Sequence, residues 1–443
     1  MTDKGPEAGI VPTDSSSLSD AALIQNIEQE SISPADETVE GELRWLNRNV
    51  VGMGVTSFLS DASHEVATAI LPLFMAAINA PAAALGIIEG FADGISSFAK
   101  LGAGWLGDRI ERRKPMIVGG YTLTAVGVGA IALATHWGFV LIARVMAWFG
   151  RGARSPLRDS IMAESVPPEA FGRAFGFERA GDSLGAVVGP ALALALLSLI
   201  GQGSPTISTY HWIFLIAMLP GLLAALNFAL LVKEKKRRAQ AGLKFWSTVR
   251  KLPPSFKLFL VGVGLFGAGD FAHTLLTLRA VELLTPTHGA AHAGEIAIAL
   301  YILHNVLYTA MSYPAGAIGD RVNKRSLLAI GYLIAAAMCA GFIIAIPSVW
   351  YLGLLFFLGG TYLAVEDTLE RAIAADLLPA EVRATGFGVL ATVNGVGDFL
   401  SSLVVGLLWT RIAPAAGFSY AAALSLLGAV VVFGLHKDKG RTA

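Results

Sequence analysis

Twelve long apolar segments run through the chain, and no other feature of the sequence limits the possible folds as strongly. A helix needs about 20 mostly apolar residues to cross a bilayer. Backbone groups in lipid must also be hydrogen-bonded within their own segment, which favours helices. We therefore expect an all-α membrane protein with twelve transmembrane helices. The expected helices cover about 50–76, 83–106, 115–134, 138–156, 173–200, 210–232, 256–280, 294–318, 326–346, 350–375, 384–411 and 416–436.

The composition supports a membrane protein and excludes several other classes. Charged residues make up 15% of the 443 residues, whereas a soluble domain has about 25%. The formal net charge is zero, so there is no global basic signal for nucleic acid. The single cysteine, Cys339, excludes an intrachain disulfide. The sequence has no phosphate-binding loop, metal-ligand spacing or nucleophile signature, so we expect no enzyme activity, no metal and no cofactor.

Basic residues gather in every second loop, and this pattern predicts the orientation of the helices. They cluster at 107–115 after helix 2, at 233–251 after helix 6 and at 319–325 after helix 8. The alternate loops carry very few Lys or Arg. Because basic loops stay in the cytoplasm, we expect a multi-pass protein of the inner or plasma membrane with both termini cytoplasmic.

The sequence repeats itself with a constant offset of 212 residues. The loop after helix 2 recurs after helix 8, so that Asp108 matches Asp320 and Gly104 matches Gly316. The repeat predicts two six-helix bundles related by an axis along the membrane normal. The expected parts are a polar, disordered tail at 1–43, an N-terminal bundle at 44–232, a basic linker at 233–254, a C-terminal bundle at 255–436 and a short tail at 437–443.

The topology and the duplicated loop resemble the major facilitator superfamily of secondary transporters over all twelve helices. The superfamily's loop motif is matched by Gly104, Asp108, Arg109, Arg112 and Arg113. "GAVVGP" at 185–190 is similar to the helix-5 motif of proton-driven antiporters, although Ala193 and Leu194 stand where that motif prefers glycines. Arg144 is similar to the superfamily's helix-4 arginine. The resemblance implies transport by alternating access, and its antiporter branch implies proton-coupled efflux.

The duplicated loop has two possible roles. Its cations can anchor the chain at the membrane surface. The acid and paired glycines at fixed spacing in both copies favour a latch between the two halves, which would be broken and remade during transport. Asp108 can accept hydrogen bonds from the start of a neighbouring helix, which we expect to be helix 11, or pair with an arginine. The predicted gating residues are Gly104, Asp108, Arg109, Arg112, Arg113, Asp320, Arg321 and Arg325.

The N-terminal half carries charged residues inside its expected helices. A charge at mid-bilayer costs at least about 2.5–3.5 kcal/mol, so each is a candidate functional residue. A carboxylic acid that leaves water beside a second acid holds a proton more tightly, as a proton carrier requires. A purely structural salt-bridge network is the alternative. The predicted proton-coupling residues are the acids Asp61, Glu65, Glu89 and Asp93, then Glu178 and Asp182, with Arg144 and Arg151 as their counter-charges.

The basic residues of helix 4 map onto acids of helix 10. The offset of 212 relates Arg154 to Glu366 and Arg158 to Glu370. This inversion of charge predicts salt bridges between the two halves through these four residues. Local pairing of Asp367 with Arg371, one helical turn apart, is the alternative.

A second group of residues is expected to line the transport cavity. Asp270 lies in the expected helix 7, and His304 and Asn305 lie in helix 8. His273 is the histidine best suited to carry a proton or contact substrate. Trp148 lies too deep in helix 4 for an interfacial tryptophan, so it can stack on an aromatic or cationic substrate or pack against lipid.

We expect a monomeric transporter that moves a small organic solute by alternating access, in exchange for protons. Its partners would be that solute, protons and membrane lipids, and no nucleic acid. A proton-coupled symporter for the uptake of a nutrient, a sugar or an organic anion is the first alternative, and a uniporter is another. A transporter-like sensor or scaffold is the alternative from a different class, and the tail at 1–43 is the feature that suggests it.

Overall fold

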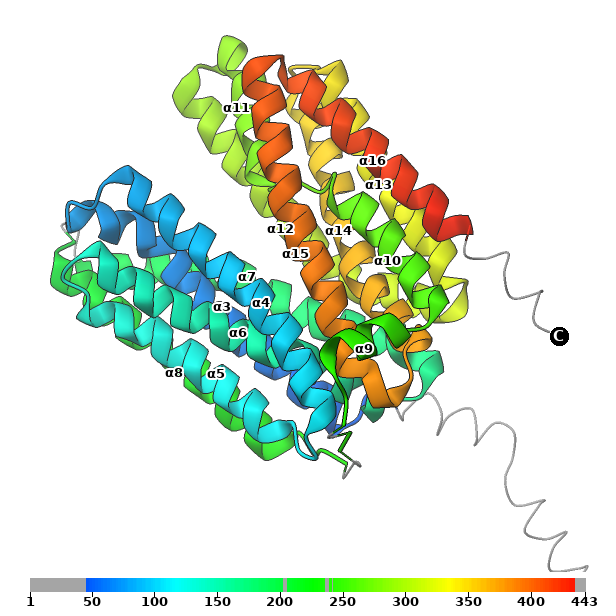
Figure 1. Ribbon diagram of the computed structural model, residues 1–443. Helices are drawn as coiled ribbons and strands as arrows, with labels where there is room; N and C mark the ends of the chain where they lie inside the picture. Colours follow the sequence, from blue (N-terminus) through cyan, green and yellow to red (C-terminus); the bar gives the residue numbers. More distant parts are fainter. Residues whose placement is uncertain (1–44, 202–204, 236–238, 241, 435–443) are drawn as a thin grey trace, which may run out of the picture. The chain divides into compact units, whose positions relative to one another are not determined.

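Figure 1 shows the computed structural model of the chain, in which residues 45–201, 205–235, 239–240 and 242–434 are described. Every regular element in these ranges is helical, which confirms the all-α class. The predicted tails at 1–43 and 437–443 lie outside the described residues. The helices are α3 (Arg48–Ala77), α4 (Ala82–Arg109), α5 (Lys114–Ala130), α6 (Trp137–Ser165), α7 (Phe171–Gly201), α8 (Ile207–Leu231), α9 (Phe245–Lys251), α10 (Pro254–Gly267), α11 (Thr274–His288), α12 (Ala290–Arg321), α13 (Lys324–Ile344), α14 (Val349–Leu377), α15 (Arg383–Arg411) and α16 (Pro414–Gly434).

The helices of the described chain form twelve spans in two bundles. The N-terminal bundle contains α3 to α8, and the C-terminal bundle contains α10 to α16, with α10 and α11 sharing one span. Eight helical segments in the described ranges are long and apolar enough to cross a membrane by length and composition. The remaining spans are α3, α4 and α6, which carry the predicted acids and arginines, and the divided span of α10 and α11.

The prediction of one continuous helix over 256–280 is wrong. The chain leaves the helix after Gly267 and enters the next at Thr274. Glycine weakens a helix by about 1 kcal/mol, which favours a break at this position. Close packing also requires glycine at position 269, because a Cβ built there would lie 2.9 Å from Leu424 Cβ. The loop expected at 281–293 is mostly helical, because α11 continues to His288.

The end of helix 4 and the structure of the linker also differ from the predictions. Helix 4 was expected to end near residue 156, but α6 continues to Ser165. Its last turns are charged, yet Arg158 and Asp159 are buried and bonded to each other, so charge does not end the helix. The short helix α9 lies within the segment predicted as a basic linker, where no helix was expected.

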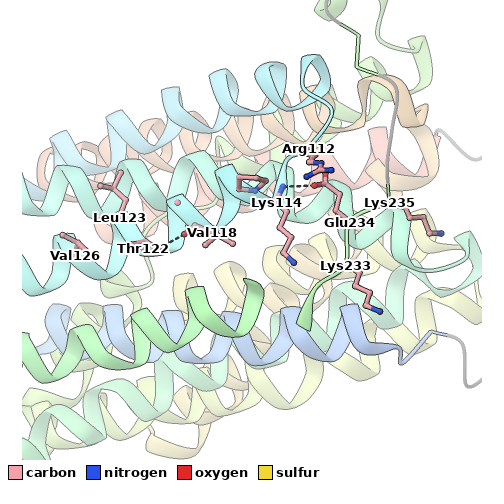
Figure 2. A pocket seen from close by; sticks show the side chains of 11 residues that line it. Arg112, Lys114, Val118, Thr122, Leu123, Val126, Lys233, Glu234 and Lys235 are labelled. Atoms are coloured by element: carbon pink, nitrogen blue, oxygen red, sulfur yellow. Dashed lines mark hydrogen bonds between the residues drawn. The ribbon is translucent and has the colours of Figure 1, made fainter. Parts of the chain in front are cut away.

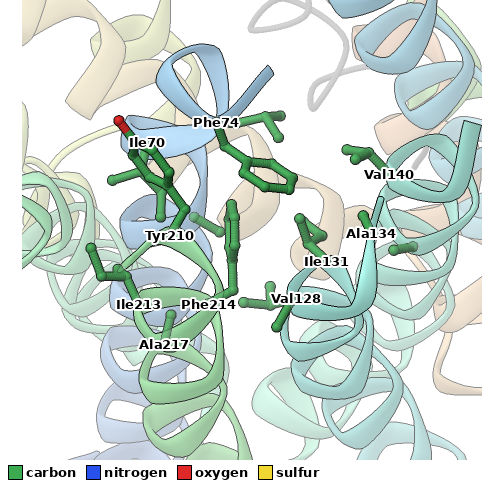
Figure 3. Packing of buried hydrophobic residues seen from close by; sticks show 14 of the residues in the cluster. Ile70, Phe74, Val128, Ile131, Ala134, Val140, Tyr210, Ile213, Phe214 and Ala217 are labelled. Atoms are coloured by element: carbon green, nitrogen blue, oxygen red, sulfur yellow. The ribbon is translucent and has the colours of Figure 1, made fainter. Parts of the chain in front are cut away.

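An apolar cluster closes one end of the N-terminal bundle. Phe74 at the end of α3 meets Phe214 of α8 in a T-shaped contact with ring centroids 5.3 Å apart. Figure 3 shows these rings with Val128 and Ile131 of the neighbouring chain segment around them. Aromatic pairs of this kind contribute about 0.5–1.5 kcal/mol beyond area burial. The cluster contains residues of all six helices from α3 to α8, and it holds them together at the end opposite the loop at 110–113.

The two bundles meet at the end that carries the loops at 110–113 and 322–323, here called the basic end. A Cβ built on Gly104 of α4 would lie 2.4 Å from the carbonyl oxygen of Ala384 in α15. The same face of α4 continues away from the basic end through Gly86 and Gly90, where a built Cβ meets nothing within 4 Å. On α15, Gly406 is equally open. The two helices therefore touch at the basic end and diverge towards the other.

Candidate functional site

Asp108 joins the end of α4 to the start of α15. Its carboxylate accepts hydrogen bonds from the backbone N–H of Thr385 at 2.7 Å, from the Thr385 hydroxyl at 2.7 Å and from the N–H of Ala384 at 3.3 Å. Asp108 is fully buried. The first N–H groups of a helix have no partner within the helix, and the helix dipole favours a negative charge there. Asp108 therefore caps a helix of the other bundle.

Asp320 makes the equivalent contact in the opposite direction. Its carboxylate at the end of α12 accepts from the backbone N–H groups of Gly172 at 2.7 Å and Arg173 at 2.9 Å, at the start of α7. The Arg173 guanidinium adds an ion pair at 3.2 Å. The offset of 212 relates Gly172 and Arg173 to Ala384 and Thr385, so each bundle caps a helix of the other through the same device.

The remaining gating residues of the first loop separate into a buried and an exposed group. Arg113 is buried and pairs with Glu164 and with Glu234, the latter at 3.1 Å. Burial by itself lowers the pKa of Arg113, but hydrogen bonds and charges from both glutamates outweigh it and raise the pKa above its ordinary value. Arg109 lies over the Trp105 ring at 4.6 Å, whereas Arg112 is exposed.

The second loop shows a similar division. Arg321 is exposed at the end of α12, and the backbone N–H of Arg325 donates to the Asn323 side chain at 3.0 Å. Lys324, which the sequence did not single out, approaches Asp320 at 3.7 Å and bonds Asp376 at 3.0 Å. The acids of the two loops therefore make the contacts between bundles, and most of their cations lie around them.

Gly172 and Gly316 let α7 and α12 approach closely at the basic end. A Cβ on Gly316 would lie 2.0 Å from the Gly172 carbonyl oxygen. We expect Gly316→Ala to force the helices apart and to cost about 1–3 kcal/mol, as overpacking does. Gly294→Ala in the same helix is the matched control, because a Cβ there meets nothing within 4 Å. Denaturant unfolding of both variants checks this, and equal stabilities would contradict it.

Arg151 of α6 lies at the centre of the charged network in the N-terminal bundle. Its guanidinium donates to Asp61 of α3 at 2.9 Å and approaches Asp182 of α7 at 3.8 Å. Asp182 also accepts from Arg179 at 2.7 Å. The Asp61 side chain is only 6% exposed. Three helices are thus tied by one alternating chain of acids and bases.

A second pair lies further from the basic end. Arg144 donates to Glu89 of α4 at 3.2 Å and to the Thr68 hydroxyl at 3.0 Å. Glu89 is partly exposed, and Asp93 one turn along α4 is exposed. Glu65 and Asp93 have no hydrogen bond or ion pair with the residues that the structure describes. Glu89 and Asp93 lie on the part of α4 that diverges from α15.

Trp148 lies between the two arginines of this network. Its ring is 5.8 Å from the Arg144 guanidinium and 5.6 Å from that of Arg151, both within cation–π range. The His64 ring meets it edge-on at 5.0 Å. Trp148 therefore packs between Arg144 and Arg151 and helps to hold both guanidinium groups in place.

The charged network crosses from one bundle to the other through two neighbouring residues of α7. Glu178 accepts from Arg371 of α14 at 3.0 Å, and Arg179 approaches Asp367 of α14 at 3.4 Å. Glu178 also pairs with Arg158 at 2.7 Å within its own bundle. The sequence marked Glu178 as a candidate, but it did not predict that Arg179, Asp367 and Arg371 join the bundles. Their charge within apolar helices was the available signal.

The predicted salt bridges of Arg154 and Arg158 with Glu366 and Glu370 are absent from the described structure. Arg154 donates to the hydroxyls of Ser60 and Thr124, both at 2.8 Å, and lies over the Tyr121 ring. Glu370 accepts from Tyr332 at 2.5 Å and from Asn394 at 2.7 Å. Glu366 is buried, and its Oε2 has no partner among the described residues. Arg154, Arg158 and Glu370 are bonded within their own bundles, so the predicted pairs do not form.

The local pair of Asp367 with Arg371 on α14, which was the alternative prediction, is present. Arg371 approaches Asp367 at 3.6 Å, one turn away. The same two side chains also reach α7 of the other bundle, so the local pair is part of the connection between bundles.

The break between α10 and α11 carries a polar chain in the C-terminal bundle. The Tyr362 hydroxyl donates to Asp270 at 2.9 Å and lies 2.8 Å from His273 Nε2. Because the hydroxyl has one proton, this arrangement requires His273 Nε2 to donate. The His304 ring follows at 4.8 Å from His273. Asn305 bonds the carbonyl oxygen of Tyr301 and does not join the chain.

The comparisons with known proteins identify the class of this chain. The Major Facilitator Superfamily profile matches residues 53–293 and 280–442. An uncharacterized MFS-type transporter of Methanocaldococcus jannaschii is 31% identical over 389 residues, which are 88% of this chain and 95% of that protein. The chain belongs to the Major Facilitator Superfamily, and it is therefore a secondary transporter of the membrane and not an enzyme.

More distant similarities complete the comparison. The crystal structure of the E. coli fucose:proton symporter FucP has a TM-score of 0.72, covers 88% of this chain and 99% of its own, and is 14% identical. This shows a common fold. Multidrug resistance protein MdtH of Photorhabdus laumondii is 35% identical over 114 residues, which are 25% of this chain and 28% of that protein.

Proposed function

We propose that this transporter exports a small organic solute in exchange for protons. The observation that carries the proposal is the unbroken charged chain from Asp61 through Arg151, Asp182 and Arg179 to Asp367, which links the two bundles. A proton on an acid of this chain removes one negative charge and weakens the neighbouring ion pair. Protonation is thereby coupled to the contact between bundles.

The path by which protons could reach these charged residues supports the same function. The bundles touch at the basic end and diverge beyond it, where Glu65, Glu89 and Asp93 lie. We propose that protons enter between the diverging helices, pass these acids and reach Asp61. Protonation of Asp61 releases Arg151, loosens the connection through Arg179, and lets the basic end open. Because basic loops stay in the cytoplasm, this opening would expose the cavity to the cytoplasm.

Two similarities favour export over uptake, and the first is that of segment 185–190 to the helix-5 motif of proton-driven antiporters. The helix-5 segment 185–190 packs on α3 through its glycines: a Cβ on Gly185 would lie 2.7 Å from the Phe58 carbonyl oxygen, and one on Gly189 would lie 2.5 Å from Glu65 Cβ. These glycines hold α7 against the helix that carries Asp61. The short similarity to a multidrug resistance protein points the same way.

Solute-induced proton movement in everted membrane vesicles tests the proposal. The lumen is acidified, and a pH-sensitive dye reports the gradient while organic cations, organic anions and sugars are added in turn. An antiporter releases lumenal protons when its solute enters, so we expect dequenching with at least one solute. If solute accumulates instead in right-side-out vesicles with an acidic exterior, the protein is a symporter for uptake.

The contact of Asp108 with the start of α15, here called the clasp, gives a separate prediction about the conformation of the protein. Hydrogen bonds to a charged group contribute about 1.5–3 kcal/mol. We expect Asp108→Asn to weaken the bonds to Thr385 and shift the population towards an open basic end. Ser312→Cys reports this, because Ser312 is fully buried and its carbonyl oxygen would lie 2.5 Å from a Cβ on Gly176 of the other bundle. The background is Cys339→Ala, which removes the native thiol.

The labelling rate of the introduced thiol should rise at least about 10-fold in the Asp108→Asn variant, which corresponds to about 1.4 kcal/mol. Glu295→Gln is the control, since the Glu295 side chain is 75% exposed. An unchanged labelling rate in the Asp108 variant would show that the clasp does not set the conformation.

A further inference from the structure

A pocket of about 1010 Å³ opens between α5 and the chain that follows α8. Figure 2 shows its two kinds of lining. Cationic side chains gather at the basic end, and apolar side chains of α5 extend along the helix away from them. The cations are Arg112, Lys114, Lys233 and Lys235. None of the transport residues discussed above except Arg112 lines this pocket.

The positive charge of the pocket is not neutralised within the described chain. Glu234 is its one acidic lining residue, and both its oxygens are already used. Its Oε1 accepts from the backbone and the guanidinium of Arg113, and its Oε2 accepts from the backbone N–H of Lys114 at 3.0 Å. The four cations have no carboxylate partner among the residues that the structure describes. The first N–H group of α5, that of Lys114, is thus already bonded to Glu234, and the four cationic side chains are the groups left to hold an anion in the pocket.

The apolar wall continues from these cations along α5. Val118 and Val126 line it, and Val126 is 41% exposed. Gly119 widens the groove, because a Cβ built there meets nothing within 4 Å. The residues of α5 form a membrane span, so this wall lies at hydrocarbon depth while the cations lie at its end. The pocket therefore matches a molecule with an anionic head and an apolar tail.

We propose that this pocket binds an anionic phospholipid, with the headgroup phosphate among the four cations and an acyl chain along Val118 and Val126. Charge complementarity selects an anionic over a zwitterionic headgroup, since cations near a membrane surface attract anionic lipids. The apolar wall selects a lipid over free phosphate. The bound lipid would also hold the start of α5 to the chain after α8, across the link already made by Glu234. This inference is independent of the transported solute and of the direction of transport.

Binding of phosphatidylglycerol to the purified full-length protein tests this site. Affinity is measured by native mass spectrometry, and the thermal unfolding midpoint is measured in phosphatidylcholine with and without phosphatidylglycerol. We expect the Lys233→Gln/Lys235→Gln variant to bind about 10- to 30-fold more weakly. Gly119→Leu should also lose binding, because the new side chain fills the groove without meeting protein atoms. Its unfolding midpoint in phosphatidylcholine alone shows that it folds.

The matched control is Lys244→Gln/Lys251→Gln, which removes two exposed cations of the same linker outside the pocket. This control should retain wild-type affinity, and millimolar inorganic phosphate should neither compete nor raise the midpoint. Equal weakening by both double variants would show diffuse attraction and overturn the site. Wild-type lipid binding by Gly119→Leu, together with competition by phosphate, would identify a simple anion site and also overturn the proposal.

Discussion

Replacing Asp61 with asparagine should abolish proton-driven transport while leaving the protein folded. Asparagine keeps the shape of the side chain and a hydrogen-bond acceptor for Arg151, but it cannot gain or lose a proton. Arg151 keeps Asp182 as a charged partner, so the network is not left without compensation. We expect uphill transport in vesicles with a pH gradient to fall to background, and solute exchange at equal pH to continue.

Two variants make this result specific. Glu295→Gln removes an acid that is 75% exposed, and it should transport as wild type does. Asp182→Asn should reduce the coupling less than Asp61→Asn, because Asp182 lies 3.8 Å from Arg151 and Asp61 lies at 2.9 Å. If Asp61→Asn still drives uphill transport, the proton is carried elsewhere, and loss in Asp182→Asn alone would name Asp182.

The ion pair between Glu178 and Arg371 should show unequal effects when its partners are removed singly. Removing one partner of a buried pair costs about 3–5 kcal/mol, because the other charge stays buried without compensation. Glu178→Gln breaks two buried pairs at once, those with Arg158 and Arg371, so we expect a loss in this range. Arg158 then keeps only Asp159 at 2.9 Å, and Arg371 keeps only Asp367 at 3.6 Å. In Arg371→Gln, Glu178 still pairs with Arg158 at 2.7 Å, so we expect a loss nearer 1–3 kcal/mol.

Denaturant unfolding of the singles and of the double variant checks this as a double-mutant cycle. The double variant should be less destabilised than the sum of the singles. Arg279 and Glu282 form the control pair: Glu282 is 37% exposed, and the pair should contribute under about 0.5 kcal/mol. Equal losses for Glu178→Gln and Arg371→Gln would contradict a central role for Glu178.

Much of the fold could be predicted from local composition. Transfer of a segment into lipid depends on that segment alone, so the spans could be recognised one by one. The break in helix 7 could not, because the glycines around Gly267 allow a break without requiring one. The position of the break depends on what packs beside it: a Cβ built on Gly397 of α15 would lie 2.8 Å from the Gly267 carbonyl carbon.

The sequence predicted which residues belong to the candidate site better than it predicted which of them form ion pairs with each other. The charges of Asp61, Glu178 and Arg151 could be recognised because charge inside a membrane helix is costly. Which acid meets which base could not be predicted, because one residue along a helix turns a side chain by about 100°. That turn lets the adjacent Glu178 and Arg179 reach Arg371 and Asp367 separately.

The sequence by itself determined the number of spans, the two related halves and the loop motif that Asp108 and Asp320 share. These properties depend on apolar content and repetition along the chain. The tertiary structure alone decided that Asp108 caps α15, that Asp320 caps α7, and that Glu366 and Glu370 stay within their own bundle. The physical reason is that contacts between bundles depend on helix rotation and on close approach at glycines, and a linear pattern of charge contains neither.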